Sequence, residues 1–236
     1  MTKKPNEEET LEKEFDKPSR QTLRTFAGRK DAIMRASIRL FLNQGYCNTT
    51  VRQIAQATDT SPSLIIYHFG SKQAIARAFL KAKMQELRSQ LLQLVDVRTE
   101  PELFCCTFVR LFQTVMSSPT LCRFYHDMIE EGLFREFFFS SDEGINASML
   151  ILAKRGIQLP PDLSNFYTHY IIPSVEMALW LSAENGVPDE NKLDIPFRSL
   201  MGLIDVPREE VNAYCQQGQA IVHRLLEEKP ELTTYE

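Results

Sequence analysis

The chain has 236 residues, of which 43% are hydrophobic and 25% are charged, an ordinary composition for a soluble protein with a real core. No apolar run approaches the roughly 18 residues of a membrane-spanning helix, and the polar N-terminus has no signal-peptide core. These features exclude a membrane protein and predict a cytoplasmic one, without a membrane partner.

Charge is unevenly distributed along the chain, although the net charge is only −4. Between residues 20 and 83, 11 Lys and Arg residues stand against only Asp31 and Asp59. Residues 86–236 carry 12 basic and 23 acidic residues. One basic segment in an acidic chain predicts a module that binds a polyanion, and a merely solvated basic face is the alternative.

The N-terminal residues 1–19 lack apolar periodicity and are predicted to form a disordered arm. A first helix is predicted at residues 29–44, where a broad apolar stripe includes Ile33 and Phe41. Gly45 follows this helix, at the position where a glycine in the left-handed conformation commonly ends a helix.

Two short helices joined by a tight turn are expected at residues 50–69. Thr50 can cap the first helix and close a capping box with Gln53. Ser61 is a good N-cap for the second helix, and Pro62 fits its first position. Helices this short do not stand alone, and a capped pair of them is typical of a helix-turn-helix.

The rest of the chain has helical periodicity nearly throughout and almost no strand alternation. Helices are predicted at residues 72–97, 102–116, 120–139, 142–156, 162–184 and 208–228. Pro173 is expected to kink the fifth of these, and residues 185–207 are expected to be irregular. The predicted fold class is all-α, with an N-terminal three-helix domain followed by a larger helical domain.

Several short motifs follow one another in even spacing: Phe41-Leu42-Asn43-Gln44-Gly45-Tyr46, Thr49-Thr50-Val51, Ile54-Ala55, Ser61, Ile65, Tyr67-His68-Phe69 and Ser71-Lys72. In these motifs the segment 30–79 resembles the DNA-binding domain of the tetracycline-repressor (TetR) family. The family usually has Ala-Gly-Val in the turn, where this chain has Thr58-Asp59-Thr60, and Asp tolerates a left-handed conformation there less easily than Gly. The expected domains are a disordered arm at 1–19, the DNA-binding domain at 20–83, and a helical regulatory and dimerisation domain at 84–236.

The candidate DNA contacts fall into two groups. Phosphate contacts are expected from Thr50, Arg52, Tyr67, His68 and Lys72, although His68 can instead be an ordinary surface histidine. Base contacts are expected from the outer face of the second short helix, through Pro62, Ser63, Leu64 and Ile66, with Ser61 beside them as the cap. Since none of these side chains is long and bidentate, we expect apolar contacts to thymine methyl groups and modest hydrogen bonding from Ser63, rather than arginine contacts to guanine.

The resemblance also implies a homodimer that binds a palindromic operator on double-stranded DNA. In the family the last two long helices form the dimer interface, here 162–184 and 208–228. The apolar residues Ile171, Ile172, Val175, Leu179, Ile221, Val222 and Leu225 are its candidates, and the core of the subunit is their alternative role.

A repressor of this kind is released from DNA when an unidentified small, largely apolar ligand binds its C-terminal domain. The candidate ligand-binding residues are Phe104, Phe108, Phe112, Tyr125, Met128, His169 and Met177, each of which can instead be ordinary core. The alternative is a TetR-like regulator that senses a protein partner or acts as an activator. A DNA-bending protein without sequence preference is a further possibility.

Catalytic and cofactor-binding motifs were not found. The chain has no GxSxG, P-loop, HExxH or dinucleotide fingerprint, so we expect no enzyme activity and no cofactor. The four histidines and five cysteines have no metal spacing. The cysteines are predicted to be small core residues in a reducing compartment, with a redox role for Cys105 and Cys106 as the alternative.

Overall fold

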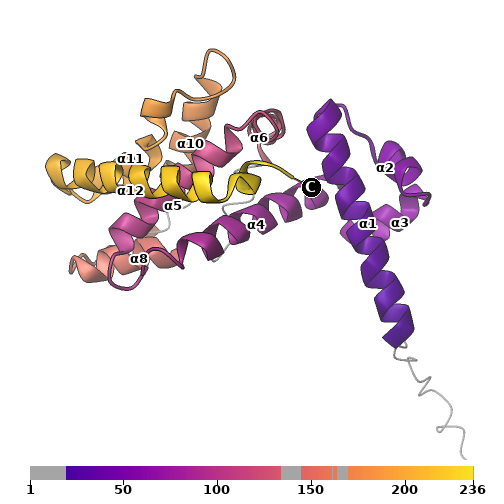
Figure 1. Cartoon of the computed structure of the whole chain (residues 1–236), viewed down its shortest axis with the longest axis horizontal. Coiled ribbons are helices and arrows are strands. Elements are labelled where there is room, and N and C mark those ends of the chain that lie inside the picture. Colours follow the sequence, from indigo (N-terminus) through magenta and orange to yellow (C-terminus); the bar gives the residue numbers. More distant parts are fainter. Residues whose placement is uncertain (1–19, 134–144, 161, 164–169, 236) are drawn as a thin grey trace, which may run out of the picture.

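A computed structural model describes residues 20–133, 145–160, 162–163 and 170–235. Over these residues the regular structure is helical and contains no β-strand, which confirms the predicted all-α class. Figure 1 shows one group of helices at the N-terminal end: α1 (Arg20–Gln44), α2 (Val51–Ala57) and α3 (Pro62–Phe69). From this group α4 (Lys72–Leu91) leads into the C-terminal helices. The predicted disordered arm at 1–19 lies outside the described residues.

The N-terminal helices and the beginning of α4 enclose a small apolar core. Its fully buried side chains come from each of the four helices: Ile33 and Phe41 of α1, Ile54 of α2, Ile65 of α3 and Ile75 of α4. The helix α1 begins at Arg20, nine residues before the predicted position. Its end is as predicted, since Gly45 follows it with a φ of 92°, a conformation that favours glycine.

The turn between α2 and α3 is closed by hydrogen bonds from both threonines. The Thr58 hydroxyl donates to the Ile54 carbonyl over 2.9 Å and lies 2.8 Å from the Thr60 hydroxyl. The Thr60 amide donates to the Ala55 carbonyl over 2.9 Å. Between them Asp59 has a φ of 49°, so it adopts the left-handed conformation for which the related family uses glycine.

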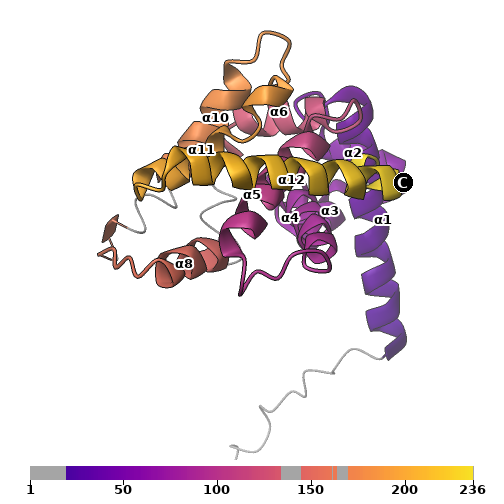
Figure 2. The same ribbon diagram turned by 60° about the vertical axis from the view of Figure 1, so that its left-hand side comes forward.

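The C-terminal helices surround α5. Their bounds are α5 (Pro101–Met116), α6 (Cys122–Glu130), α8 (Ile145–Lys154), α10 (Ile172–Leu181), α11 (Ile195–Leu203) and α12 (Arg208–Glu228), with short 3₁₀ turns η2 (Glu190–Lys192) and η3 (Pro230–Thr233). Helix α5 contacts α4, α8, α11 and α12, and most of its side chains are buried. Figure 2 shows α12 crossing the molecule in front of α5. No described helix is both long enough and apolar enough to span a bilayer.

Besides the start of α1, the predictions for residues 185–207 and for the end of α4 are wrong. Residues 185–207 are not irregular throughout, because they contain η2 and α11. Pro196 lies in the first turn of α11, where its missing amide costs no helical hydrogen bond. Helix α4 ends at Leu91 rather than near residue 97. Pro173 stands in the first turn of α10, directly after the π-helical residues 170 and 171, and most of the helix predicted before it lies outside the described residues.

The left-handed Asp59 gives a test of the turn. The change Asp59→Ala should lower the free energy of unfolding by about 1 kcal/mol, because alanine lacks the short polar side chain that makes this conformation tolerable. The matched change Asp59→Gly should not lower it. Urea unfolding of both variants measures the difference, and an alanine variant as stable as the glycine variant would contradict this account of the turn.

Candidate nucleic-acid interface and regulatory core

The short helices α2 and α3 begin with the predicted caps. The Thr50 hydroxyl accepts from the backbone N–H of Gln53 over 3.2 Å. The side-chain oxygen of Gln53 accepts from the backbone N–H of Thr50 over 2.8 Å, and the two bonds close the capping box. The Ser61 hydroxyl accepts from the Leu64 amide over 3.2 Å, and Pro62 occupies the first turn of α3. These contacts satisfy amide groups that have no partner within the helix.

Helix α3 has one buried and one outward face. Ile65 is fully buried against the domain core, whereas Ile66 is 45% exposed and Tyr67 is 72% exposed. Among the other candidate DNA contacts, Thr50, Arg52, Ser61, Pro62 and Ser63 are exposed, and Leu64 and His68 are half-buried. The Tyr67 and His68 rings lie 5.6 Å apart between centroids. The structure therefore brings the predicted DNA-contacting residues to one capped helix pair.

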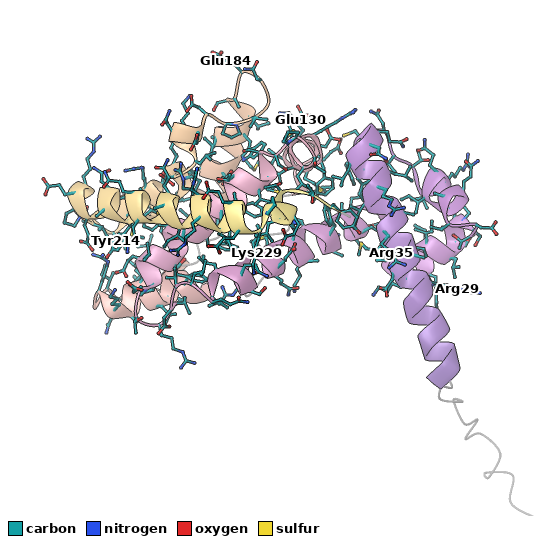
Figure 3. All side chains as sticks on the ribbon, viewed as in Figure 1. Arg29, Arg35, Glu130, Glu184, Tyr214 and Lys229 are labelled. Atoms are coloured by element: carbon teal, nitrogen blue, oxygen red, sulfur yellow. The ribbon has the colours of Figure 1, made fainter. Side chains whose placement is uncertain are left out.

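Basic side chains lie on the same domain. The exposed members are Arg29, Lys30, Arg35 and Arg39 of α1 and Arg52 of α2. Figure 3 places Arg29 and Arg35 along α1, at the end of the molecule that carries α2 and α3. The Lys30 ammonium also lies 5.5 Å from the centroid of the Phe69 ring at the end of α3. Solvent-facing positive charge beside an outward helix is the electrostatic pattern that attracts nucleic acid.

Lys72 has a structural partner that the sequence did not indicate. Its ammonium donates to the Tyr46 and Thr49 carbonyls, both over 2.9 Å, and lies 3.9 Å from the centroid of the Tyr46 ring. Burial lowers the pKa of Lys72 from its ordinary value. Since an ammonium has three N–H groups, these two hydrogen bonds brace the segment between α1 and α2 and leave one N–H group.

Most of the candidate ligand-binding residues form a continuous row of rings. Phe104 stacks on Phe108 at 6.3 Å, Phe108 on Phe112 at 6.4 Å, and Phe112 meets the edge of Tyr125 at 5.4 Å, all between centroids. Met128 is fully buried, Met177 is half-buried against the same core, and His169 lies outside the described residues.

A buried polar network adjoins this row. Tyr125 donates to the carboxylate of Glu176 over 2.7 Å, the Gln113 amide donates to its other oxygen, and the Trp180 indole donates to Gln113 over 2.7 Å. Burial raises the pKa of Glu176 to about 7, although both hydrogen bonds oppose that shift. Sequence reasoning missed Glu176 and Gln113. The available signal was one glutamate within the apolar sequence of α10.

Three of the apolar residues that were predicted to face a second subunit are buried in the core of the single chain. Leu179, Val222 and Leu225 are buried in the single chain, where they belong to its core. Ile171, Ile172, Val175 and Ile221 are half-buried. The buried three are therefore subunit core residues, which was the alternative role.

Two capped short helices, a closed turn between them and an outward second helix define a helix-turn-helix DNA-binding domain. A family profile described as "Bacterial regulatory proteins, tetR family" matches residues 33–79, which hold this helix pair. Residues 33–79 are therefore similar to the DNA-binding domain of the TetR family, as the motifs predicted.

Curated relatives match mainly in the same region. The chain is 45% identical over 47 residues to the HTH-type transcriptional regulator TcmR of Streptomyces glaucescens, which is 20% of this chain and 21% of the relative. It is 30% identical over 90 residues to the HTH-type transcriptional regulator HbdR of Aromatoleum sp. (strain CIB), which is 38% of this chain and 39% of the relative. The matches thus span between about a fifth and two fifths of these relatives. Both are regulators rather than enzymes, in agreement with the prediction.

Two crystal structures resemble the whole chain weakly. One, described as a candidate TetR-family transcriptional regulator from Mesorhizobium loti, has a TM-score of 0.43, 15% identity, and coverage of 75% of this chain and 97% of its own. The other, a gamma-butyrolactone receptor (ArpA-like protein), has a TM-score of 0.40, 15% identity, and coverage of 87% and 100%.

The buried Glu176 predicts a stability that depends on pH. The folded carboxyl keeps its proton up to about pH 7, whereas the unfolded one releases it near pH 4.5. The free energy of unfolding should therefore fall as pH rises from about 4.5 through about 7, by at most about 3 kcal/mol from this group. Above that pH the contribution levels off.

The variant Glu176→Gln removes this titration, because an amide does not ionise. The new side chain can still accept from Gln113 and donate to the Tyr125 hydroxyl, so the network is kept. In urea unfolding between pH 5 and pH 8, the variant should gain stability relative to the unchanged protein as pH rises. The exposed Glu184→Gln is the control and should show no such trend. A stability difference that stays constant over this pH range would contradict the assignment.

Proposed function

We propose that this protein is a sequence-specific transcriptional regulator that acts as a homodimeric repressor on a palindromic operator. A small, largely apolar ligand that binds the C-terminal helices would release it from DNA. The observation that carries the proposal is the outward face of α3, where Ser63, Ile66 and Tyr67 are exposed on a helix anchored by the buried Ile65. This face belongs to the family-matched segment, and the same domain carries exposed arginines.

The proposed division of labour follows from the chemistry of the exposed groups. Arg52, Tyr67 and the remaining N–H of Lys72 would contact phosphates, together with Thr50 and His68, and set affinity and position. Ser63, Ile66, Pro62 and the partly exposed Leu64 would face base edges in the major groove. The apolar ones suit thymine methyl groups better than guanine, and the Ser63 hydroxyl would add a modest hydrogen bond.

The proposed domains, 20–83 for DNA binding and 84–236 for regulation and dimerisation, share one helix. Helix α4 runs from Lys72 to Leu91 without a break across residue 83. The buried Lys83 in its middle donates to the Thr234 carbonyl over 3.3 Å and pairs with Glu86 over 3.0 Å. A ligand that moves the C-terminal helices would therefore act on the DNA-binding domain through α4.

Selection of DNA from a random pool tests the specificity directly. A dimer should select a palindrome whose half-sites lie about one helical turn (roughly 34–36 Å) apart. Ser63→Ala should relax the preference at one position of each half-site, with a loss of about 0.5–1.5 kcal/mol on the selected sequence from one lost hydrogen bond. Arg52→Ala should weaken all sequences about equally and flatten the salt dependence. Selected DNA without a repeated half-site would contradict the proposal and favour a DNA-bending protein.

The proposed dimer surface consists of exposed residues rather than the buried ones. On α10 and the turn before it, Tyr170 is 50% exposed and Leu181 is 51% exposed, and Ser174 and Ala178 are exposed between them at helical spacing. These four residues fall on one face. They lie on the helix that the family resemblance assigns to the interface, and they form a stripe of small and apolar side chains.

Sedimentation at micromolar concentration tests the dimer. The unchanged protein should sediment as a dimer, and Ala178→Asp should shift it towards the monomer, because two copies of the new charge would meet near the symmetry axis. The exposed Ala82→Asp on α4 is the matched control and should remain dimeric. A monomeric unchanged protein would contradict the dimer, and a dimeric Ala178→Asp variant would contradict its location on α10.

A further inference from the structure

Three chemically reactive side chains that are far apart in the sequence meet between α5, α11 and α12. Cys106 lies on α5, Cys215 on α12, and Asp194 directly before α11. All three are buried, and their sulfur and carboxylate oxygen atoms lie within 4.8 Å of one another. The sequence could not indicate this group, because 109 positions separate the two cysteines. Figure 1 shows these helices at the end of the molecule opposite to α2 and α3.

The separation of the two sulfur atoms has the value that a tetrahedral metal ion requires. Cys106 Sγ and Cys215 Sγ lie 3.8 Å apart. Two thiolates bound to tetrahedral Zn²⁺ at about 2.3 Å each are about 3.8 Å from one another. The sulfur atoms can therefore hold such an ion without moving apart, whereas a disulfide would need them at about 2.05 Å.

Asp194 supplies a buried carboxylate that lies within 4.8 Å of both sulfur atoms and interacts with Cys215. Its Oδ2 accepts from Arg110 Nη1 over 2.9 Å, which fixes the orientation of the carboxylate. Its Oδ1 is buried and has no hydrogen-bond partner among the described residues. A buried carboxylate oxygen without a partner is unfavourable, and a cation beside it removes the penalty. Arg110 is a positioning residue of the kind that orients ligands in metal sites.

The charges of the group also balance around a divalent ion. Two thiolates and one carboxylate bring three negative charges, while Arg110 and one divalent cation bring three positive charges. Without the ion, two neutral thiols and the Arg110–Asp194 ion pair are neutral as well. Exchange of two thiol protons for one divalent cation therefore leaves the net charge of the group unchanged, and Glu190, the exposed second partner of Arg110, lies at its edge in both cases.

We propose that Cys106, Cys215 and Asp194 bind a thiophilic divalent metal ion, with Zn²⁺ as the fitting ion and a water molecule in the fourth position. Binding breaks two S–H bonds, forms two bonds from sulfur and one from Asp194 Oδ1 to the ion, and releases two protons to solvent. Two thiolate ligands select Zn²⁺ over the hard ions Mg²⁺ and Ca²⁺. The ion would join α5, the beginning of α11 and α12.

Titration of the reduced full-length chain with Co²⁺ tests the site, because cobalt reports thiolate coordination by its absorption. We expect one Co²⁺ per chain, with thiolate-to-metal absorption in the near ultraviolet that Zn²⁺ abolishes by displacement. A background variant, Cys47→Ser/Cys105→Ser/Cys122→Ser, retains only the two proposed cysteines and should bind as the unchanged chain does.

In that background, Cys215→Ser should weaken binding by more than about 100-fold, beyond the 10–100-fold typical of outer-shell changes. Asp194→Asn provides a second variant in case the serine variant fails to fold, and circular dichroism checks both. No thiolate absorption in the background chain, or absorption that survives Cys215→Ser in a folded protein, would overturn the proposal. So would a Cys106–Cys215 disulfide formed with peroxide in a chain that takes up no Co²⁺. Metal binding is measured without DNA, so its outcome is separate from that of the operator selection.

Discussion

The enclosure of α5 is the constraint on which the C-terminal half depends. A helix that is buried on nearly all sides needs a hydrogen-bond or ion-pair partner for each of its polar side chains. The polar side chains of α5 have such partners on several neighbouring segments. Glu102 accepts from Lys154, the last residue of α8, over 2.8 Å and from Arg155, just after it, over 3.0 Å. Arg110 reaches Asp194 before α11, and Gln113 bonds to Glu176 of α10. Sliding α5 by one turn would leave all of these groups buried and unpaired, at about 1–3 kcal/mol or more each. The polar contacts therefore select one arrangement of the surrounding helices.

The contact between α5 and α12 depends on a glycine instead. A Cβ added to Gly218 would lie 3.1 Å from Thr107 Oγ1 and 3.4 Å from its Cα, so only glycine allows this approach without a shift. Thr107 is already satisfied, since its hydroxyl donates to the Leu103 carbonyl over 2.7 Å. The close approach at Gly218 brings Cys215, one turn earlier on α12, into contact with Cys106. A metal ion between the two sulfurs would thus use a proximity that helix packing already imposes.

The N-terminal domain could be predicted because its signals are local. The caps Thr50 and Ser61 act within three residues, and the left-handed Gly45 directly follows the helix that it ends. The C-terminal half was predictable only as helical. Pro196 lies in the stretch that was predicted to be irregular, yet it stands in the first turn of α11, because proline is found both in loops and at the beginning of helices. In the network around Glu176, this residue bonds to Tyr125, which is 51 positions away in the sequence, and to Gln113, which is 63 positions away. No rule based on sequence spacing predicts contacts of that kind.

The two halves meet at α6, and this position limits how a signal can pass. Phe124 stacks on Phe41 of α1 at 5.9 Å and meets Phe79 of α4 at 5.2 Å between ring centroids. The next residue, Tyr125, bonds to the buried Glu176. A rotation of α6 that relieves one contact therefore disturbs the other. A ligand can exploit this link only if it binds one orientation of α6 more tightly than the other, because equal affinity shifts no population. Under the proposed function, a ligand that replaces Tyr125 as the hydrogen-bond partner of Glu176 would meet this requirement. It could bond to Glu176 only in the orientation of α6 in which Tyr125 has moved away.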